Sequence, residues 1–313
     1  MILKKIITKK SLNYLRSKKY LFKIKLNLFK FNSVFKNNEL PKGSIVYISD
    51  SNIWPGGLVD RLKGIISLYE YALENKRPFY IYFDKKNDFS LFLKPLDNNL
   101  YLHNFTFGLF SCKVHFYIDN TIIKKYDNIF STKQVNFIYT NLDLLKYKYK
   151  INSDQKWRQL FNKLFYPSNK IINKINNIIG NKVFSVYSFR FRSRMGDFED
   201  DGKCWSDSTK KNKVHLLNKA VLNLLKKDSS PCIYLASDSL QYIKQLAKLK
   251  PNIFFYYHLS EPDINDLERS LAEFLIISKS QKILQFKTSD MFTGAFSKYA
   301  SVLGNINYNL INV

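Results

Sequence analysis

The sequence predicts an α/β protein with two domains, each built around a parallel β-sheet. Short apolar runs typical of buried strands alternate with helical stretches of about 10 to 15 residues. The chain has 313 residues, of which 45% are hydrophobic, so it can bury the cores of two domains of ordinary size. No run of about 18 uncharged apolar residues occurs, and a membrane-spanning helix is therefore not expected.

The first domain is expected at residues 41–167, after a basic arm at 1–40. It opens with a strand, a glycine turn, an amphipathic helix and a second strand, which together make one βαβ unit. In order, the expected elements are strand 43–49, the helix after Gly56 and Gly57, strands 79–83, 113–119 and 135–140, and a helix from Asp154 that ends before Pro167.

The second domain, expected at 168–313, alternates helices and strands more regularly. This pattern predicts a parallel sheet covered on both faces. Two such domains would enclose a cleft, and ligands in open α/β sheets bind beyond the carboxyl ends of the strands. The expected helices are 168–180, 212–227, 238–250, 264–278 and about 296–303, and the expected strands are 182–191, 231–237, 252–258 and 282–286.

The net charge of +25 indicates an anionic partner such as a nucleotide, a membrane face or a nucleic acid. Part of the lysine excess is equally explained by an AT-rich genome. Residues 1–38 contain many lysines and no Asp or Glu, with apolar residues interleaved. Lysines interrupt every candidate signal-peptide core, so a cytoplasmic protein is expected. The arm could lie on an anionic membrane face, or it could be a solvated tail or an ordinary first helix.

The cysteines and histidines do not form recognisable ligand or disulfide patterns. Cys112, Cys204 and Cys232 lack paired spacing, which argues against a disulfide framework and a zinc cluster and favours a reducing compartment. Glu199 and Asp201 could form an acidic metal-binding motif, but nearby arginines can neutralise a diphosphate without one. No metal site is therefore expected.

Arginines follow the expected strand 182–191. Arg190 and Arg192 are two residues apart and could point to the same side of an extended chain. A guanidinium binds two phosphate oxygens at once and stays charged, so Arg192 is the first candidate to bind a diphosphate. The alternative is a surface ion pair with the nearby acids Glu199, Asp200 or Asp201.

Two further segments follow expected strands. In Ser237-Asp238-Ser239, an aspartate at the sheet edge could accept a hydrogen bond from a ribose or a base, or Ser237 or Asp238 could simply cap the next helix. Ser297 opens the last helix, where free N–H groups attract anions, and capping is again the alternative.

The glycine turn of the first domain is the candidate acceptor side. Gly56 and Gly57 permit close approach of a ligand or merely a tight turn, and they are not part of a dinucleotide-binding fingerprint. Asp60 and Arg61 follow in the first helical turn and would face the cleft. Asp60 could be a general base, or a carboxylate favoured by the helix dipole.

An ordered series of segments resembles the fucosyltransferase superfamily that includes the nodulation fucosyltransferases and the protein O-fucosyltransferases. The series is PGGLVDRLKGIISLYEYALENKRPFYI, WRQLFNKLF, VYSFRFRSRMGDF, IYLASDS and FSKYAS. The resemblance implies a GT-B-like architecture of two Rossmann-like domains, with the donor nucleotide in the second. It also implies inverting transfer of fucose from GDP-fucose without a metal or other cofactor.

The resemblance assigns residues one by one. Arg190 and Arg192, then Gly196 and Asp197, match the family's His-x-Arg-Arg-x-Asp signature, with arginine at position 190 where histidine is usual. Arg192 corresponds to the phosphate-binding arginine, and Arg194 is a candidate for the second one. Asp238 resembles the acidic residue that helps hold the nucleotide, while Phe296 and Ser297 resemble the family's diphosphate-contacting Phe-Ser pair.

The expected function is therefore inverting transfer of a sugar from a nucleotide sugar to a hydroxyl of a glycan acceptor, such as a surface polysaccharide or a lipid-linked glycan. Arg192, backed by Arg190, would neutralise the leaving GDP, and Asp60 could assist the acceptor. One alternative is the same fold with another nucleotide sugar. The other is a basic nucleic-acid-binding protein, which is not expected because the aromatic residues lie mostly within strands.

Overall fold

The computed structural model describes residues 40–49, 56–84, 88–102, 112–117, 130–195, 204–257 and 266–313. The chain divides into two compact units, unit 1 at Met1–Ser168 and unit 2 at Asn169–Val313. Within the described ranges, none of the helices has both the length and the apolar character needed to cross a membrane.

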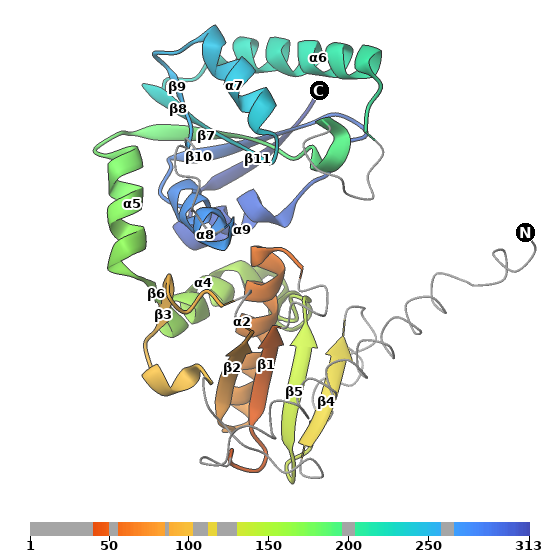
Figure 1. Ribbon diagram of the computed structural model, residues 1–313, viewed down its shortest axis with the longest axis vertical. Coiled ribbons are helices and arrows are strands. Elements are labelled where there is room, and N and C mark those ends of the chain that lie inside the picture. Colours follow the sequence, from red (N-terminus) through yellow and green to blue (C-terminus); the bar gives the residue numbers. More distant parts are fainter. Residues whose placement is uncertain are drawn as a thin grey trace, which may run out of the picture. The chain divides into compact units, whose positions relative to one another are not determined.

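Unit 1 contains a four-stranded parallel sheet with strand order β2-β1-β5-β4 (Figure 1). The two central strands are buried at every position, which agrees with their mostly apolar sequences. The strands are β1 (Ile45–Ser49), β2 (Phe79–Phe83), β4 (Cys112–Tyr117) and β5 (Val135–Thr140), and the helices are α2 (Leu58–Glu74), α3 (Leu145–Tyr149) and α4 (Ser153–Leu164).

A small antiparallel ladder in unit 1 was not anticipated from the sequence. It pairs β3 (Leu93–Pro95) with β6 (Phe165–Pro167). Each strand has three residues, too few for an alternating pattern to be recognised. Two short 3₁₀ helices, Asn98–Leu100 and Lys150–Asn152, lie between these two strands in the sequence.

Helix α2 packs unusually close to the sheet of unit 1. A β-carbon placed on Gly64 would lie 2.0 Å from the carbonyl oxygen of Thr140 and 2.8 Å from the ring of Tyr47. Because only glycine leaves this space open, the backbone of α2 can pack directly against β5. This contact fixes the helix whose first turn carries Asp60.

Unit 2 contains a five-stranded, fully parallel sheet with order β11-β10-β7-β8-β9. Figure 1 shows α6 and α7 on one face of this sheet and α8 and α9 on the other. The strands are β7 (Phe184–Phe189), β8 (Cys232–Ser237), β9 (Phe254–Phe255), β10 (Lys282–Lys287) and β11 (Asn307–Asn312), and the helices are α5 (Asn169–Ile179), α6 (Asp207–Leu225), α7 (Leu240–Leu249), α8 (Asp266–Ile277) and α9 (Ala295–Gly304).

Both units therefore confirm the predicted α/β class with parallel sheets. In unit 2 the chain proceeds from β7 through β8 to β9 on one side, and then returns to place β10 and β11 on the other. The direction of strand order thus reverses between β7 and β10. Ligands of doubly wound sheets bind at such a reversal, beyond the carboxyl ends of the strands.

Two strands of unit 2 differ from the sequence-based prediction. The strand expected at 252–258 shortens to β9 (Phe254–Phe255), which pairs only with β8 at the edge of the sheet. The last strand, β11, was missed because its asparagine-rich sequence is partly exposed and lacks a buried apolar face. Its backbone nonetheless pairs along the whole length of β10.

Candidate functional site

The loops that follow β7, β8 and β10 meet at the carboxyl edge of the unit 2 sheet. Arg190 follows β7 directly and Asp238 follows β8, and the backbone N–H of Phe292, in the loop after β10, donates to the carbonyl of Arg190 at 3.4 Å. These three loops surround the point where the strand order reverses. The structure thus brings together three of the segments singled out in the sequence.

Asp238 organises the chain after β7. Its two carboxylate oxygens accept the backbone N–H groups of Phe191, at 2.8 Å, and Arg192, at 2.7 Å. The same carboxylate lies 3.1 Å from Nη1 of Arg190, and its side chain is only 8% exposed. Burial raises the pKa of Asp238, while the Arg190 guanidinium and the two backbone donors oppose that rise.

The alternative that Asp238 or Ser237 caps the following helix is wrong. Ser239 is the N-cap of α7, and its hydroxyl accepts the N–H of Tyr242 at 3.3 Å. The Asp238 carboxylate is therefore available for the β7 loop. Because its oxygens already accept donors from the protein, it holds the arginine-bearing loop in place.

Arg190 and Arg192 do not lie on one extended strand, although their spacing of two residues predicted it. β7 ends at Phe189, and Arg192 begins a 3₁₀ turn, Arg192–Met195, with a left-handed φ of 55°. Between them Phe191 is fully buried in the core of unit 2. The buried phenylalanine and the Asp238 hydrogen bonds, rather than strand periodicity, determine where the two arginines lie.

The arginine side chains contact the loop after β10. The Arg192 guanidinium lies 4.1 Å from the centroid of the Phe292 ring, a cation–π geometry, and Phe292 is 40% exposed. A β-carbon on Gly294 would lie 3.3 Å from Cγ of Arg190, so this glycine gives the arginine stem room. Arg192 itself has a left-handed backbone, which is strained in a non-glycine residue, and such strain is concentrated at functional sites.

Ser297 lies within the first turn of α9 and is buried. Its hydroxyl is 2.6 Å from that of Ser188 on β7, which ties the start of α9 to the central strand. The alternative capping role does not apply, because Gly294 is the N-cap of α9 and no side chain caps the helix. Phe296 packs against Phe274 of α8 with ring centroids 5.5 Å apart.

Glu273 on α8 was not singled out from the sequence. The hydroxyl of Tyr234 donates to its Oε1 at 3.4 Å, and the charges of Asp238 and Arg190 act on it. Burial raises the pKa of Glu273 to about 7, against the lowering effect of Arg269. The sequence signal is a lone carboxylate inside the apolar run SLAEFLII, where a solvated glutamate would not be expected.

In unit 1, the glycine turn and the start of α2 lie close together. Gly56 has a left-handed φ of 69°, and a β-carbon there would lie 3.0 Å from Cβ of Asp60. Gly57 is the N-cap of α2 and contributes no side-chain hydrogen bond. Asp60 is 38% exposed and forms a 2.6 Å ion pair with Lys63, one turn further along the helix.

Arg61 is placed differently from its neighbour Asp60. It is 8% exposed, and its guanidinium carbon lies 5.9 Å from the centroid of the Phe89 ring. Burial lowers its pKa, although Tyr47 and other neighbours oppose that effect. Only Asp60 of this pair is an exposed group, and the acceptor-side role of both residues stays a prediction.

Several candidates lie outside the described residues. These are Asp197, which the family signature assigned to the donor site, and the acids Glu199, Asp200 and Asp201. In the described ranges of the chain, no three His, Cys, Asp or Glu side chains are grouped as a potential metal site.

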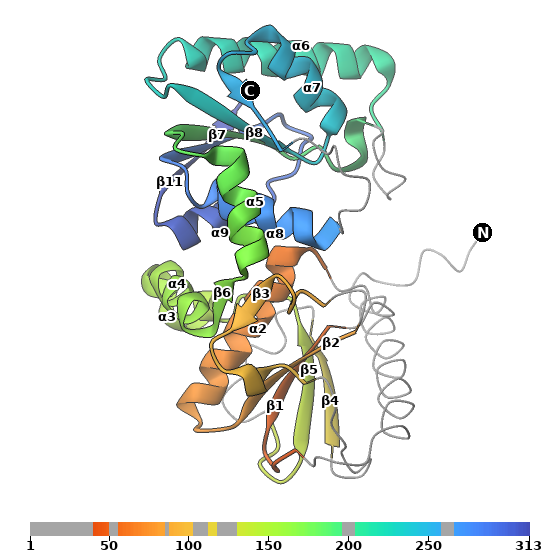
Figure 2. The ribbon, with the colours of Figure 1, turned by 60° about the vertical axis from the view of Figure 1, so that its left-hand side comes forward.

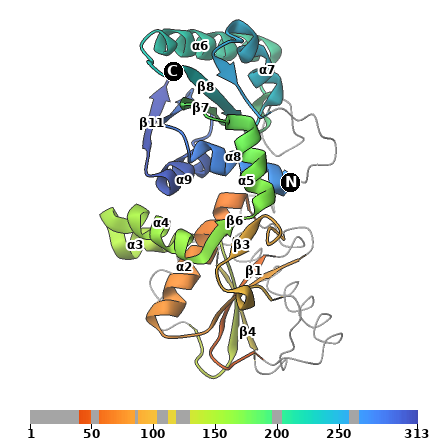
Figure 3. The ribbon, with the colours of Figure 1, turned by 90° about the vertical axis from the view of Figure 1, so that its left-hand side faces the viewer.

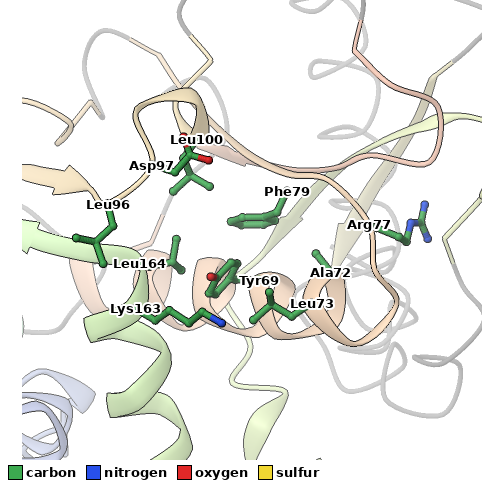
Figure 4. Close-up of a pocket in the computed structure, with 10 residues that line it drawn as sticks. All are labelled: Tyr69, Ala72, Leu73, Arg77, Phe79, Leu96, Asp97, Leu100, Lys163 and Leu164. Carbon is green, nitrogen blue, oxygen red and sulfur yellow. The ribbon is translucent and has the colours of Figure 1, made fainter.

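A separate hollow of about 390 Å³ occurs in unit 1 (Figure 4). It lies between the second half of α2, the first residue of β2 and the end of α4, and so at the amino end of β2. It contains none of the candidate residues and is not the site expected from the sequence. Its lining residues are Tyr69, Ala72, Leu73, Arg77, Phe79, Leu96, Asp97, Leu100, Lys163 and Leu164.

Comparison with solved structures shows which fold the chain adopts. A NodZ α-1,6-fucosyltransferase crystal soaked with GDP-fucose matches with a TM-score of 0.55 and 14% identity, over 84% of this chain and 93% of that chain. The Bradyrhizobium fucosyltransferase NodZ matches with a TM-score of 0.54 and 15% identity, over 84% and 94%. A mutant of Arabidopsis thaliana FUT1 in complex with GDP matches with a TM-score of 0.54 and 13% identity, over 95% of this chain and 78% of that chain.

No protein-family model matches the sequence, and neither does any curated protein. The structural matches nevertheless show that the chain has the GT-B-like α/β fold of fucosyltransferases, in agreement with the resemblance found in its sequence. At these low identities the likeness establishes the fold, whereas activity depends on the site.

Proposed function

We propose that this protein is a glycosyltransferase that binds GDP-fucose at the carboxyl edge of the unit 2 sheet and transfers the fucose to a glycan hydroxyl with inversion. The observation that carries the proposal is the Asp238 carboxylate, which holds the backbone of Arg192 and the guanidinium of Arg190 at the reversal of strand order. Two fixed cations at such an edge suit a diphosphate. Fold relatives were crystallised with GDP or GDP-fucose.

In the proposed reaction the acceptor oxygen attacks C1 of the sugar while the bond from C1 to the β-phosphate oxygen breaks. Negative charge builds on the leaving GDP, and Arg192, backed by Arg190, stabilises it electrostatically. The backbone N–H groups at the start of α9 add a favourable dipole for the phosphates. Two arginines neutralise a diphosphate, so the proposal requires no metal.

The proton of the acceptor hydroxyl needs a base, and Asp60 is the proposed one. It is a partly exposed carboxylate in the first turn of α2, and Gly56, which lacks a side chain, leaves room for it. In this structure Lys63 neutralises it, so the acceptor would have to displace or share that ion pair. A carboxylate that exchanges a lysine for a substrate hydroxyl can accept its proton.

Asp238 and Glu273 are proposed to have different roles. Asp238 positions the two arginines, since its oxygens accept donors from the chain itself. Glu273 is proposed to support the fold of unit 2, since it accepts a hydrogen bond from the hydroxyl of Tyr234. The choice of GDP rests on the sequence resemblance and on fold relatives whose structures carry GDP or GDP-fucose, and another nucleotide sugar is the alternative donor.

The acceptor and the location of the protein are also proposals. A surface polysaccharide or a lipid-linked glycan would provide the acceptor hydroxyl, in a cytoplasmic reaction. The basic arm at 1–38, which lies outside the described residues, would hold the enzyme at an anionic membrane face through its lysines.

Thermal unfolding in the presence of nucleotides tests the donor assignment. A ligand that binds only the native state stabilises it in proportion to its affinity. GDP and GDP-fucose are expected to raise the unfolding temperature without added magnesium, and UDP, ADP and CMP-sugar are not. Stabilisation by UDP or CMP compounds alone would reassign the donor, and no stabilisation by any nucleotide would reject the donor site.

A further inference from the structure

A short segment of unit 1 exposes apolar side chains among lysines. Ile151 is 97% exposed, the largest fraction among the described large hydrophobic side chains, and Tyr147 is 47% exposed. Both lie in the stretch KYKYKI, residues 146–151, which carries three lysines and no acid. An isoleucine in water forgoes the stabilisation of about 1.5–3 kcal/mol that full burial gives, and it would recover part of that by entering an apolar phase.

The segment is firmly attached to the rest of unit 1. Leu144 and Leu145 are buried, and the Tyr149 hydroxyl donates to Glu70 and Glu74 of α2. α3 and α4 lie side by side (Figure 3). Because residues 145 and 149 share one face of a helical turn, Tyr147 is directed to the opposite face. The exposed tip is thus a fixed feature of the fold.

The backbone at the tip holds Ile151 outward. Lys150 has a φ of 47° and a ψ of −111°, a conformation that non-glycine residues rarely adopt. Lys150 is both the C-cap of α3 and the first residue of the 3₁₀ turn Lys150–Asn152, and the chain changes direction there. Figure 2 shows α3 next to α4 within unit 1. Strain of this kind persists where the surrounding structure maintains it, and often where it serves a function.

We propose that residues 146–151, here called the KYKYKI tip, dock unit 1 onto an anionic lipid surface. Lysines are attracted to anionic headgroups, tyrosine favours the interfacial region, and an isolated apolar side chain gains most by entering the acyl boundary. Lys148 and Lys146 also pair with Glu74 and Asp143, so Lys150 is the principal electrostatic contact. This surface is distinct from the basic arm at 1–38.

Vesicle binding of the full chain tests the proposal. Vesicles of equal phosphatidylcholine and phosphatidylglycerol should bind the protein, and pure phosphatidylcholine vesicles should bind it much less. Ile151→Ser should lower the partition coefficient about tenfold, because the isoleucine no longer enters the lipid. The matched control is Ile172→Ser on α5, where the isoleucine is 39% exposed, and it should change the coefficient little.

The charge contribution is tested with a second pair of variants. Lys150→Glu should weaken binding to the anionic vesicles about tenfold. Lys219→Glu makes the same change of net charge at an exposed position on α6 and should have a much smaller effect. Equal effects of the two would show that only the total charge matters, which would overturn the proposal.

Insertion is measured directly with Ile151→Trp and brominated lipid, which quenches tryptophan at short range. Quenching should rise for Ile151→Trp and stay at the wild-type level for Ile172→Trp. The native tryptophans are Trp54, Trp157 and Trp205, of which the last two are buried, and the wild-type protein measured in parallel gives the background of all three. If Ile151→Ser binds as wild type does and Ile151→Trp is not quenched, the tip does not enter lipid and the arm at 1–38 alone accounts for binding.

Discussion

Asp238 and Arg190 lie 3.1 Å apart at the ends of neighbouring strands of unit 2, and the same carboxylate accepts the N–H groups of Phe191 and Arg192. One side chain after β8 thereby holds residues 190–192, the start of the loop after β7. The placement of these residues, and not merely the presence of two arginines, supports the proposed diphosphate site.

Replacing this carboxylate should destabilise the protein. Asp238→Asn keeps the size of the side chain but turns an N–H₂ group toward a backbone N–H, so one buried donor loses its acceptor. We expect the free energy of unfolding to fall by about 2 kcal/mol, as measured by urea denaturation at pH 7. Asp207→Asn in the first turn of α6 is the control, with a loss of about 0.5 kcal/mol or less. Equal losses would contradict the positioning role of Asp238.

Arg192→Ala should remove catalysis without unfolding the protein, because the side chain is only partly buried. The transfer rate from GDP-fucose should fall about a hundredfold to a thousandfold, the usual effect of losing one electrostatic contact to developing charge. Circular dichroism and the unfolding temperature should stay close to those of the wild type. Lys219→Ala on α6 is the control, and a nearly unchanged rate in Arg192→Ala would remove this residue from the mechanism.

Phe292 should act through Arg192. The ring lies 4.1 Å from the guanidinium carbon, so Phe292→Leu removes the cation–π contact while keeping an apolar side chain. We expect kcat to fall about threefold to fivefold, whereas Phe292→Tyr should retain the wild-type rate. If Phe292 had only a structural role, its replacement would lower the unfolding temperature instead of acting on kcat through Arg192. The unfolding temperatures of both variants are therefore measured alongside kcat.

Glu273 should make stability depend on pH. Its pKa is raised to about 7 in the folded protein, so between pH 4.5 and 7 the folded state retains a proton that the unfolded state releases. Stability should therefore fall as the pH rises through this range, by up to about 3 kcal/mol. Glu273→Gln should lose this part of the pH dependence. Urea denaturation at pH 5 and pH 7.5 measures both proteins, and identical pH slopes would rule out the assignment.

Gly64 should be intolerant of any side chain. Its β-carbon would lie 2.0 Å from the Thr140 carbonyl oxygen, so Gly64→Ala forces α2 away from the sheet. We expect a loss of about 2 to 3 kcal/mol in the free energy of unfolding. Gly57→Ala is the matched control, because nothing lies within 4 Å of its β-carbon and its φ of −70° suits alanine. Similar stabilities of the two variants would show that the approach of α2 is not tight.

The sequence was sufficient for most elements of the fold. Apolar runs identified the buried strands β1, β5 and β7, because a strand buried on both faces leaves a continuous hydrophobic signature. The same rule could not find β11, which is partly exposed, or the three-residue strands β3 and β6. Arg190, Arg192 and Asp238 were candidates because they follow predicted strands, and the family resemblance then gave each of them a role.

The sequence specified most helices and strands, because these depend on local periodicity. It thereby also showed which types of residue follow the ends of these strands. The arrangement at those ends was decided by contacts between distant parts of the chain. Asp238 binds N–H groups 46 and 47 residues away, and Ser297 contacts Ser188 across 109 residues. Pairings over such separations form only when the strands align in the sheet, so local sequence patterns carry no direct record of them.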